Sequence, residues 1–158
     1  MSDKPNMSYT QSVIHEVQRQ SDMIPLLGTH KNNQDITVKG VNLSSGTVVY
    51  GQIWSIMNDD SVFEENHKFN PSRYLQADGK MLNKALLERT IPFSIGKRNC
   101  VGEGLARMEL FLIFSAVIQT YAFIPNSNID LSPDWGAVLT SKPYTYQLIP
   151  QTLYYFVK

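Results

Sequence analysis

The chemistry encoded by this sequence centres on its only cysteine, Cys100, within the stretch IPFSIGKRNCVGEGLARMELFLIF. Gly96 and Gly102 flank the cysteine, and Lys97 and Arg98 place positive charge beside its sulfur. An apolar helical pattern begins just after the loop, so the thiol is expected at a helix N-terminus. Nearby cations and a helix N-terminus both favour a thiolate over a thiol. We therefore expect Cys100 to have unusual thiolate character.

Four roles are open to such a cysteine. It could be buried and inert, as single cysteines commonly are. A zinc site needs several clustered ligands, yet His15, His30 and His67 fall in unlike segments. A nucleophile needs a base and an orienting group, for which no local signature is present. The fourth role is a thiolate ligand to haem iron, which needs an electropositive loop, backbone N–H groups near the sulfur and glycines that admit the macrocycle.

A helix is expected near the start of the chain, from about Tyr9 to Asp22, because apolar residues recur there at helical spacing before Pro25 ends the pattern. On this helix Glu16 and Arg19 stand three positions apart, so they share one face and can pair. Pairs at this spacing usually lie in solvent and contribute little to stability. Taken by itself, the spacing indicates a surface ion pair.

The elements between this helix and the cysteine loop are expected to be short. Strands are predicted at Asp35–Val38 and Thr47–Tyr50, and brief helices at Gln52–Met57 and Met81–Thr90. The connection from Ser61 to Lys80 is polar but carries Phe63, Phe69 and Tyr74. These aromatic residues indicate an ordered, irregular segment and not a flexible linker.

The longest helical pattern follows the cysteine, from about Val101 to Tyr121, and it is apolar almost all round, which is typical of a buried helix. Its most apolar run, Leu110–Ile118, is too short to span a bilayer. The end of the chain, Tyr144–Val157, alternates loosely and predicts a terminal β-hairpin. The expected fold class is therefore mainly α with small β-sheets.

The composition is typical of a soluble globular chain. Its 158 residues suffice for one modest domain with a core, or for one piece of a larger domain. Lys and Arg number 14, as do Asp and Glu, so no field that attracts nucleic acid is expected. A single cysteine excludes an internal disulfide, and the polar N-terminal stretch lacks the apolar core of a signal peptide.

The residues around Cys100 resemble a known signature. The run FSIGKRNCVG, from Phe93 to Gly102, fits F-x-x-G-x-R-x-C-x-G of the cytochrome P450 haem-thiolate proteins at every fixed position. Two further runs are similar to family motifs in the right order. EVQR, from Glu16 to Arg19, resembles E-x-x-R, and FNPSRY, which includes Arg73, resembles F-x-P-x-R-F.

The resemblance implies roles for the signature residues. Cys100 would be the axial thiolate ligand to the iron of haem, iron protoporphyrin IX, and is the metal ligand expected here. Phe93 would shield the sulfur, and Gly96 would turn the chain beneath the porphyrin, with Gly102 completing the signature. Arg98 would pair with a haem propionate, a contact suited to a guanidinium. None of these residues is expected to be catalytic in itself.

Other implied roles have competing interpretations. His30 lies where related proteins have a Pro-His pair whose histidine meets a propionate, but Thr29 replaces the proline, and an exposed loop histidine is the alternative. Leu26-Leu27 and Ala137–Leu139 fall in regions that line the substrate pocket in the family, or they are ordinary core. The cations Lys97 and Arg107 would help form a basic face for an acidic electron-donor protein, or they are ordinary surface charges.

The resemblance also changes the interpretation of Glu16 and Arg19. In the family, the corresponding residues join an arginine of the later motif, here Arg73, in a buried salt-bridge triad. Removing one member of such a network strands a charge away from water and should cost several kcal/mol. The implied role is structural, since the triad supports the haem-side core.

At the level of the whole chain, residues 1–158 are expected to form a partial cytochrome P450 domain, its haem-ligand half, with no second domain. They resemble the C-terminal third of a microsomal-type animal member: the E-x-x-R helix, short strands, meander, cysteine loop, long buried helix and terminal hairpin. The long central helix with its acid–alcohol pair and the N-terminal membrane anchor of the full-length family have no counterpart. We expect a fragment, isoform or partial product.

The implied activity is monooxygenation: insertion of one oxygen atom into a small organic substrate, a lipid or xenobiotic, with electrons from NADPH-cytochrome P450 reductase. The alternative is a catalytically inactive haem-binding or regulatory fragment that lacks the oxygen-activating helix, and a third possibility is an unstable product without function. The full-length family is expected on the cytosolic face of the endoplasmic reticulum membrane. This chain carries no membrane segment and is expected to be soluble.

Overall fold

Helices and short strands occur in separate groups along the chain, of which the computed structural model describes residues 2–21, 23–130, 132–134, 138 and 140–151. The helices, with η marking the 3-10 type, are η1 (Lys4–Asn6), α1 (Ser8–Ser21), α2 (Ile53–Met57), η2 (Pro71–Tyr74), α3 (Lys84–Arg89), η3 (Gly96–Arg98) and α4 (Glu103–Thr120). The strands are β1 (His30–Lys31), β2 (Ile36–Val38), β3 (Val41–Leu43), β4 (Val48–Val49), β5 (Tyr121–Pro125), β6 (Pro133–Asp134), β7 (Thr140–Ser141) and β8 (Tyr146–Pro150).

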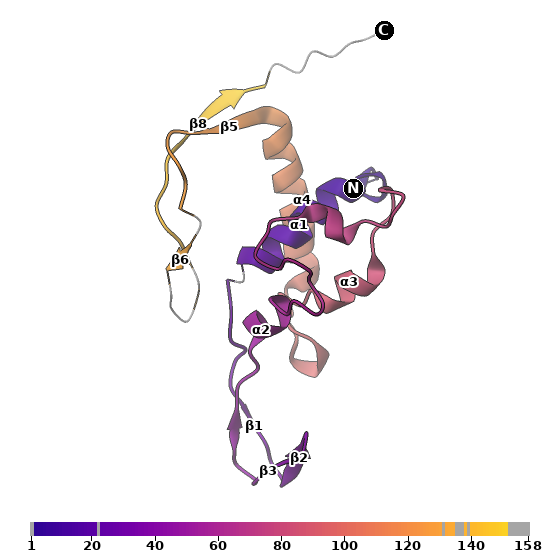
Figure 1. Cartoon of the computed structure of the whole chain (residues 1–158), viewed down its shortest axis with the longest axis vertical. Helices are drawn as coiled ribbons and strands as arrows, with labels where there is room; N and C mark the ends of the chain where they lie inside the picture. The colour runs from indigo at the N-terminus through magenta and orange to yellow at the C-terminus, as the bar shows by residue number, and fades with distance from the viewer. Residues whose placement is uncertain (1, 22, 131, 135–137, 139, 152–158) are drawn as a thin grey trace.

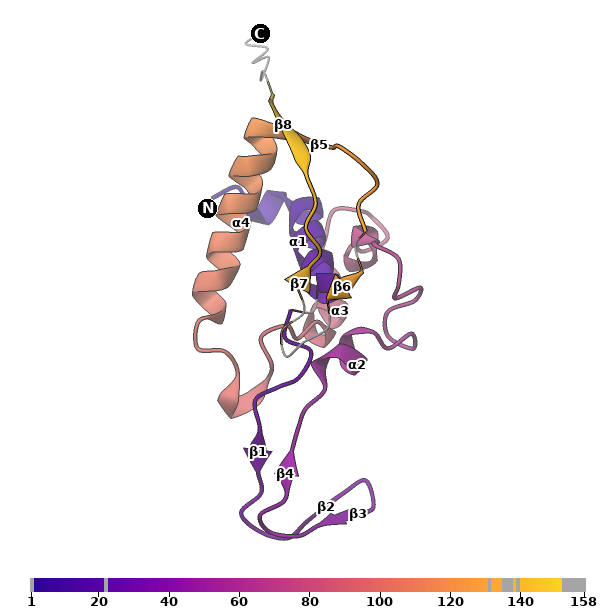
Figure 2. The ribbon, with the colours of Figure 1, turned by 90° about the vertical axis from the view of Figure 1, so that its left-hand side faces the viewer.

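Two antiparallel β-ribbons extend from a helical centre (Figure 1). In the lower ribbon β1 pairs with β4, with His30 opposite Val49, and β2 pairs with β3. The second ribbon continues from the end of α4, where β5 pairs with β8 so that Tyr121 lies opposite Pro150. Figure 2 shows α4 and α1 side by side in the helical centre. Within the part of the chain described, no helix is long and apolar enough to cross a membrane.

Side-chain caps begin two of the short helical segments that precede the cysteine loop. The Asn70 side chain accepts a hydrogen bond from the Ser72 N–H, and Pro71 follows it at the first position of η2. The Asn83 side chain accepts from the Leu86 N–H at 3.3 Å and starts α3. Such caps satisfy backbone donors that the first turn leaves free, so these segments form despite their shortness.

The core is small and includes charged side chains. Its apolar members are Ile53, Met57, Phe63, Tyr74 and Phe111, and its polar members are Ser12, Glu16, Arg19 and Thr90. Most of them lie where α1 meets α2, η2 and the connection between these two. The prediction that aromatic residues hold this connection in place is confirmed for Phe63 and Tyr74, both buried, and is wrong for Phe69, which is 53% exposed.

Several predicted elements coincide with observed ones. The predicted first helix corresponds to α1, although Asp22, its predicted last residue, lies outside the described residues. The short helices α2 and α3 lie within the segments predicted for them. Of the two predicted strands, the first corresponds to β2 and the second to β4, but they do not pair with each other. Their partners, β3 and β1, were not predicted.

The long helix α4 has the predicted position, but the prediction that it is buried is wrong. Only Phe111 among its described side chains is buried, at 5% exposure, whereas Leu105 and Ile113 are 58% and 62% exposed. The physical reason is that α1 packs on one side of α4, and the described chain supplies no other helix to cover the rest. The helix therefore presents a long apolar surface to solvent.

The predicted terminal hairpin, Tyr144–Val157, falls within the described residues only as far as residue 151. In that part the chain forms strand β8, whose partner is β5, which directly follows α4. Residues 152–157 lie outside the described range. The Gln151 N–H donates to the Thr120 carbonyl at 2.8 Å and ties the ribbon to the helix end.

Candidate cofactor-binding site

The cysteine loop, residues 91–102, connects α3 to α4 and is closed by backbone hydrogen bonds. The Cys100 N–H donates to the Phe93 carbonyl at 2.9 Å, and the Asn99 N–H donates to the Gly96 carbonyl at 3.2 Å. At its start the Ser94 N–H donates to the Ile91 carbonyl at 3.0 Å. These bonds hold the cysteine beside the first residues of its own signature.

Backbone conformation explains one of the signature glycines. Gly96 has φ +82°, a left-handed conformation that costs free energy for residues with a Cβ. No atom lies within 4 Å of a Cβ built there, so conformation and not crowding requires the glycine. Ser94 is also left-handed, with φ +66°. Such strain persists only where the surrounding structure enforces it, and it concentrates at functional sites.

The loop presents its cysteine to solvent at the start of α4. Cys100 is exposed, so the interpretation of a buried, inert cysteine is wrong. The Glu103 N–H, the first in α4, donates to the Cys100 carbonyl at 3.3 Å. Among the described residues, no group of three or more His, Cys, Asp or Glu side chains is placed to hold a metal ion, which leaves a zinc site without further ligands.

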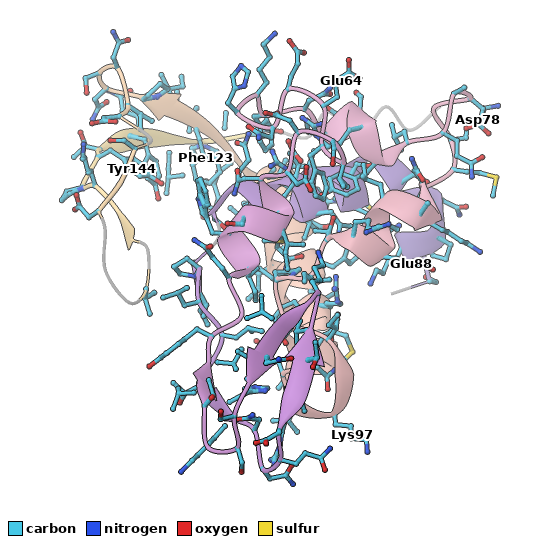
Figure 3. All side chains as sticks on the ribbon, turned by 60° about the horizontal axis from the view of Figure 1, so that its bottom comes forward. Glu64, Asp78, Glu88, Lys97, Phe123 and Tyr144 are labelled. Carbon is cyan, nitrogen blue, oxygen red and sulfur yellow. The ribbon has the colours of Figure 1, made fainter. Side chains whose placement is uncertain are left out.

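Two exposed cations accompany the thiol in the loop. Arg98 and Lys97 belong to η3, and both are exposed. Figure 3 shows the Lys97 side chain projecting away from the ribbon at this end of the molecule. The third cation near the loop, Arg107, is partly buried, because its Nε donates to Glu103 Oε1 at 2.8 Å and its guanidinium lies 5.2 Å from the centre of the Phe93 ring.

A buried salt-bridge triad joins α1 to η2 and confirms the prediction for Glu16, Arg19 and Arg73. Arg19 donates from Nε and Nη2 to the two carboxylate oxygens of Glu16, at 2.9 and 3.0 Å. Arg73 Nε donates to Glu16 Oε1 at 3.2 Å. The Glu16 and Arg19 side chains are 0% exposed, and that of Arg73 is 7% exposed. The alternative of a surface ion pair is therefore wrong.

The triad also organises the irregular connection before η2. Arg19 Nη1 donates to the Met57 carbonyl at 2.9 Å and Nη2 donates to the Asn66 carbonyl at 2.7 Å. Arg73 Nη1 donates to the Glu64 carbonyl at 2.7 Å. Among the described residues, no strand or helix supplies hydrogen bonds to these carbonyls. The arginine side chains of the triad supply them instead and so hold the irregular segment in place.

A pair of hydroxyl groups joins the triad to the cysteine loop. Tyr74, next to Arg73, and Thr90, the residue before the loop, lie 2.8 Å apart at their side-chain oxygens, and both are buried. Thr90 donates to the Leu86 carbonyl at 3.0 Å, so the Tyr74 hydroxyl is the donor to Thr90. Burial raises the pKa of Tyr74 to about 12 and keeps it protonated.

The sequence did not single out this pair, although one signal was present. Tyr74 stands where the family motif has a phenylalanine, and the extra hydroxyl needs a partner when it is buried. Thr90 carried no signal at all.

A small cavity of about 50 Å³ lies between α1 and α4. It is lined by Lys4, Gln11, Ile14, His15, Gln18, Arg107 and Phe111. Burial, with smaller effects from the Arg107 and Lys4 charges, lowers the pKa of His15 to about 4, so this histidine is neutral near pH 7. Its Nδ1 atom is buried without a hydrogen-bond partner in the described structure.

The structure does not bring every predicted residue to the loop. His30 is exposed on β1, and none of the hydrogen bonds and ion pairs between described residues joins it to the cysteine loop. Leu26 is 46% exposed and forms an isolated bridge with Gln52, while Leu27 is half-buried against Gly51. In the other predicted pocket segment, residues 137 and 139 lie outside the described range and Val138 is 50% exposed.

Comparison with known proteins decides the family. The sequence model described as Cytochrome P450 matches residues 1–149. The chain belongs to the cytochrome P450 family. It is 38% identical over 154 residues to cytochrome P450 2D6 of Pan paniscus, which covers 96% of this chain and 30% of that protein. It is 39% identical over 153 residues to cytochrome P450 2A13 of Homo sapiens, with 94% and 30% covered.

A fish relative extends the comparison beyond mammals. The chain is 37% identical over 149 residues to cytochrome P450 2K1 of Oncorhynchus mykiss, with 91% of this chain and 29% of that protein covered. The resemblance to animal cytochromes P450 is thereby confirmed. The chain spans about 30% of the length of these relatives.

The loop of this cytochrome P450 chain fits the haem that the family implies. Its exposed thiol is a soft ligand of the kind that binds haem iron, and the exposed guanidinium of Arg98 suits a carboxylate. Ile95 and Val101, on either side of these groups, are apolar and strongly exposed, at 69% and 105%. A thiol, a cation and exposed apolar side chains together match an apolar macrocycle that carries acidic groups.

Proposed function

We propose that this chain is the haem-ligand part of a cytochrome P450 monooxygenase and that Cys100 is the axial thiolate ligand. The strongest support is the exposure of the one thiol. It lies in a strained, hydrogen-bonded loop that carries the family signature. Haem bound through a thiolate supplies oxygen-activation chemistry, because the sulfur donates electron density to the iron. The whole of residues 1–158 would then be part of one domain.

The other residues of the loop hold and orient the ligand. Gly96 provides the left-handed turn that the loop needs, and the backbone bond from Cys100 to Phe93 fixes where the sulfur leaves the chain. Arg98 would neutralise a propionate through a charge-assisted contact, with His30 as a second candidate for such a contact. Phe93 would limit the access of water to the sulfur. A Cβ at Gly102 would lie 3.9 Å from Cys100 Sγ, so the glycine there leaves room beside the sulfur.

For the complete protein we propose a small organic substrate, a lipid or xenobiotic, with electrons supplied by NADPH-cytochrome P450 reductase at the cytosolic face of the endoplasmic reticulum. Lys97 is the exposed cation of the loop that is best placed to meet an acidic electron donor. Leu26 and Leu27, neither of them fully buried, are candidates to line the substrate pocket.

The proposal is tested by adding haem to the full chain, reducing it and recording its carbon monoxide spectrum. We expect a thiolate-type Soret band that is lost in Cys100→Ala and retained in Ser94→Ala. No haem uptake, or an unchanged band in Cys100→Ala, would contradict the proposed ligand. Product formation with reductase and NADPH then tests whether the loaded chain is an enzyme.

A second candidate function is a haem-binding or regulatory chain without turnover. The exposed apolar surface of α4 favours it, because side chains such as Leu105 and Ile113 leave that side open to water. Oxygen chemistry needs a site from which water is excluded. The two candidates are separated by the turnover assay: both predict the thiolate-type spectrum, and only the first predicts product.

A further inference from the structure

Four residues around the cysteine form a closed circuit of contacts. Cys100 donates its N–H to the Phe93 carbonyl at 2.9 Å, and the Phe93 ring lies 5.2 Å from the Arg107 guanidinium carbon. Arg107 Nε donates to Glu103 Oε1 at 2.8 Å. The Glu103 N–H donates to the Cys100 carbonyl at 3.3 Å, which completes the circuit. Loop and helix are thus joined on both sides of the cysteine.

The circuit fixes the Phe93 ring from a rigid element. Glu103 and Arg107 stand four positions apart on the first turns of α4, a spacing that places both on one face. Their side chains are 30% and 31% exposed, so the cation–π contact and the ion pair are partly removed from water and are stronger than at an open surface. The backbone bond to Cys100 sets the position of Phe93, and Arg107 sets the orientation of its ring.

We propose that Arg107, held by Glu103, is a positioning residue. It fixes the orientation of the Phe93 ring within the cysteine loop, and the fixed ring limits the water that reaches the Cys100 sulfur. This inference rests on the proposed haem-thiolate function. It also gives Arg107 a role different from that of the exposed cation Lys97, which projects from the loop (Figure 3). Arg107 is engaged within the molecule, so its charge is largely satisfied there.

The contact itself can be tested without haem. Fluorine NMR of the full chain with fluorophenylalanine at position 93 reports the surroundings of that ring. Arg107→Gln and Glu103→Gln should shift or broaden the resonance, whereas Lys97→Gln, which removes a cation from the same loop, should leave it unchanged. Glu103→Gln retains the arginine and serves if Arg107→Gln does not fold. An unchanged resonance in both circuit variants would overturn the proposal.

The reduction potential of the haem-loaded chain separates positioning from simple charge. Loss of one positive charge near the iron stabilises the ferric form and lowers the potential, which is the result expected for Lys97→Gln. Release of the Phe93 ring lets water donate hydrogen bonds to the sulfur and raises the potential. Arg107→Gln removes one positive charge, as Lys97→Gln does, but it also releases the ring. We expect the effect of the released ring to be the larger, so that the potential rises. In a Phe93→Leu background the same substitution should lower the potential, as Lys97→Gln does.

The possible outcomes distinguish this inference from the proposed function. A fall in potential for Arg107→Gln in the unaltered background would show a charge effect alone and overturn the positioning role. If the fluorine resonance responds but the chain binds no haem through its thiolate, the contact stands and the proposed function fails. A thiolate-type spectrum with an unresponsive fluorine resonance keeps the proposed function and removes the role of Arg107.

Discussion

Glu16 and Arg19 pair through both carboxylate oxygens, at 2.9 and 3.0 Å, with neither side chain exposed. Glu65 and Lys68 have the same spacing in sequence, yet both lie more than half exposed. Two ion pairs with the same spacing therefore differ in how much stability is lost when one partner is removed. A charge that loses its partner in the interior cannot recover its hydration.

This contrast gives the first prediction. Glu16→Gln, which leaves two arginines without their carboxylate, should lower the free energy of unfolding by about 3–5 kcal/mol. Glu65→Gln should leave it nearly unchanged, since its pair lies in solvent. Urea denaturation of both variants measures the difference. Equal effects of the two substitutions would show that the triad does not hold the fold.

A second prediction concerns pH and His15. Its pKa is about 4 in the folded chain and 6.5 in the unfolded chain, so the unfolded state binds more protons between these values. The stability that the neutral histidine contributes is present above pH 6.5 and is lost as the pH falls toward 4. From pH 7 to pH 5 the free energy of unfolding should fall by about 2 kcal/mol from this group.

His15→Gln provides the comparison for that measurement, because glutamine retains polarity but does not titrate. The loss of stability between pH 7 and pH 5 should be about 2 kcal/mol larger in the native sequence than in the variant. The same pH dependence in both chains would rule out a buried, neutral His15.

The third prediction concerns the hydroxyl pair that leads to the cysteine loop. Tyr74→Phe removes the donor to Thr90, while Thr90 retains its own bond to the Leu86 carbonyl. The free energy of unfolding should fall by about 0.5–1.5 kcal/mol. Tyr50, which is 60% exposed, offers the matched control, and Tyr50→Phe should have an effect within about 0.5 kcal/mol. A larger effect at Tyr50 would contradict the assignment.

The fourth prediction uses two apolar residues of α4. Phe111 is 5% exposed and lines the small cavity between α4 and α1 together with His15. Ile113 is 62% exposed. Phe111→Ala should cost about 3–5 kcal/mol of unfolding free energy, because it leaves a cavity. Ile113→Ala should cost less than about 0.5 kcal/mol. Thermal unfolding of both variants measures the two losses of stability. A similar loss at both positions would contradict the exposure of Ile113 on α4.

The cysteine loop could be predicted because its signature is short and contiguous. Phe93, Gly96 and Cys100 stand within eight positions of one another, and the left-handed turn at Gly96 is a property of the residue type. The burial of Glu16 could not be predicted from its helix, because Arg73 lies 57 positions away. Only resemblance to a longer pattern connected the two.

The errors have physical causes of the same kind. The apolar pattern of α4 indicates which side chains favour burial. It does not indicate whether another helix is present to cover Leu105 or Ile113. The pairing of β5 with β8 joins segments far apart in sequence, and a local pattern carries no register. The contact between Arg107 and Phe93 depends on how the loop folds back on α4 and left no trace in either motif.

The most direct test of the central claim is an iron–sulfur vibration that depends on Cys100. Because the chain has one cysteine, cysteine labelled with a heavy sulfur isotope places the label at a single thiol. Resonance Raman spectra of the ferric, haem-loaded chain should show an iron–sulfur stretch that moves to lower frequency with the label and disappears in Cys100→Ala. A haem-loaded chain without any isotope-sensitive band would contradict thiolate ligation by Cys100.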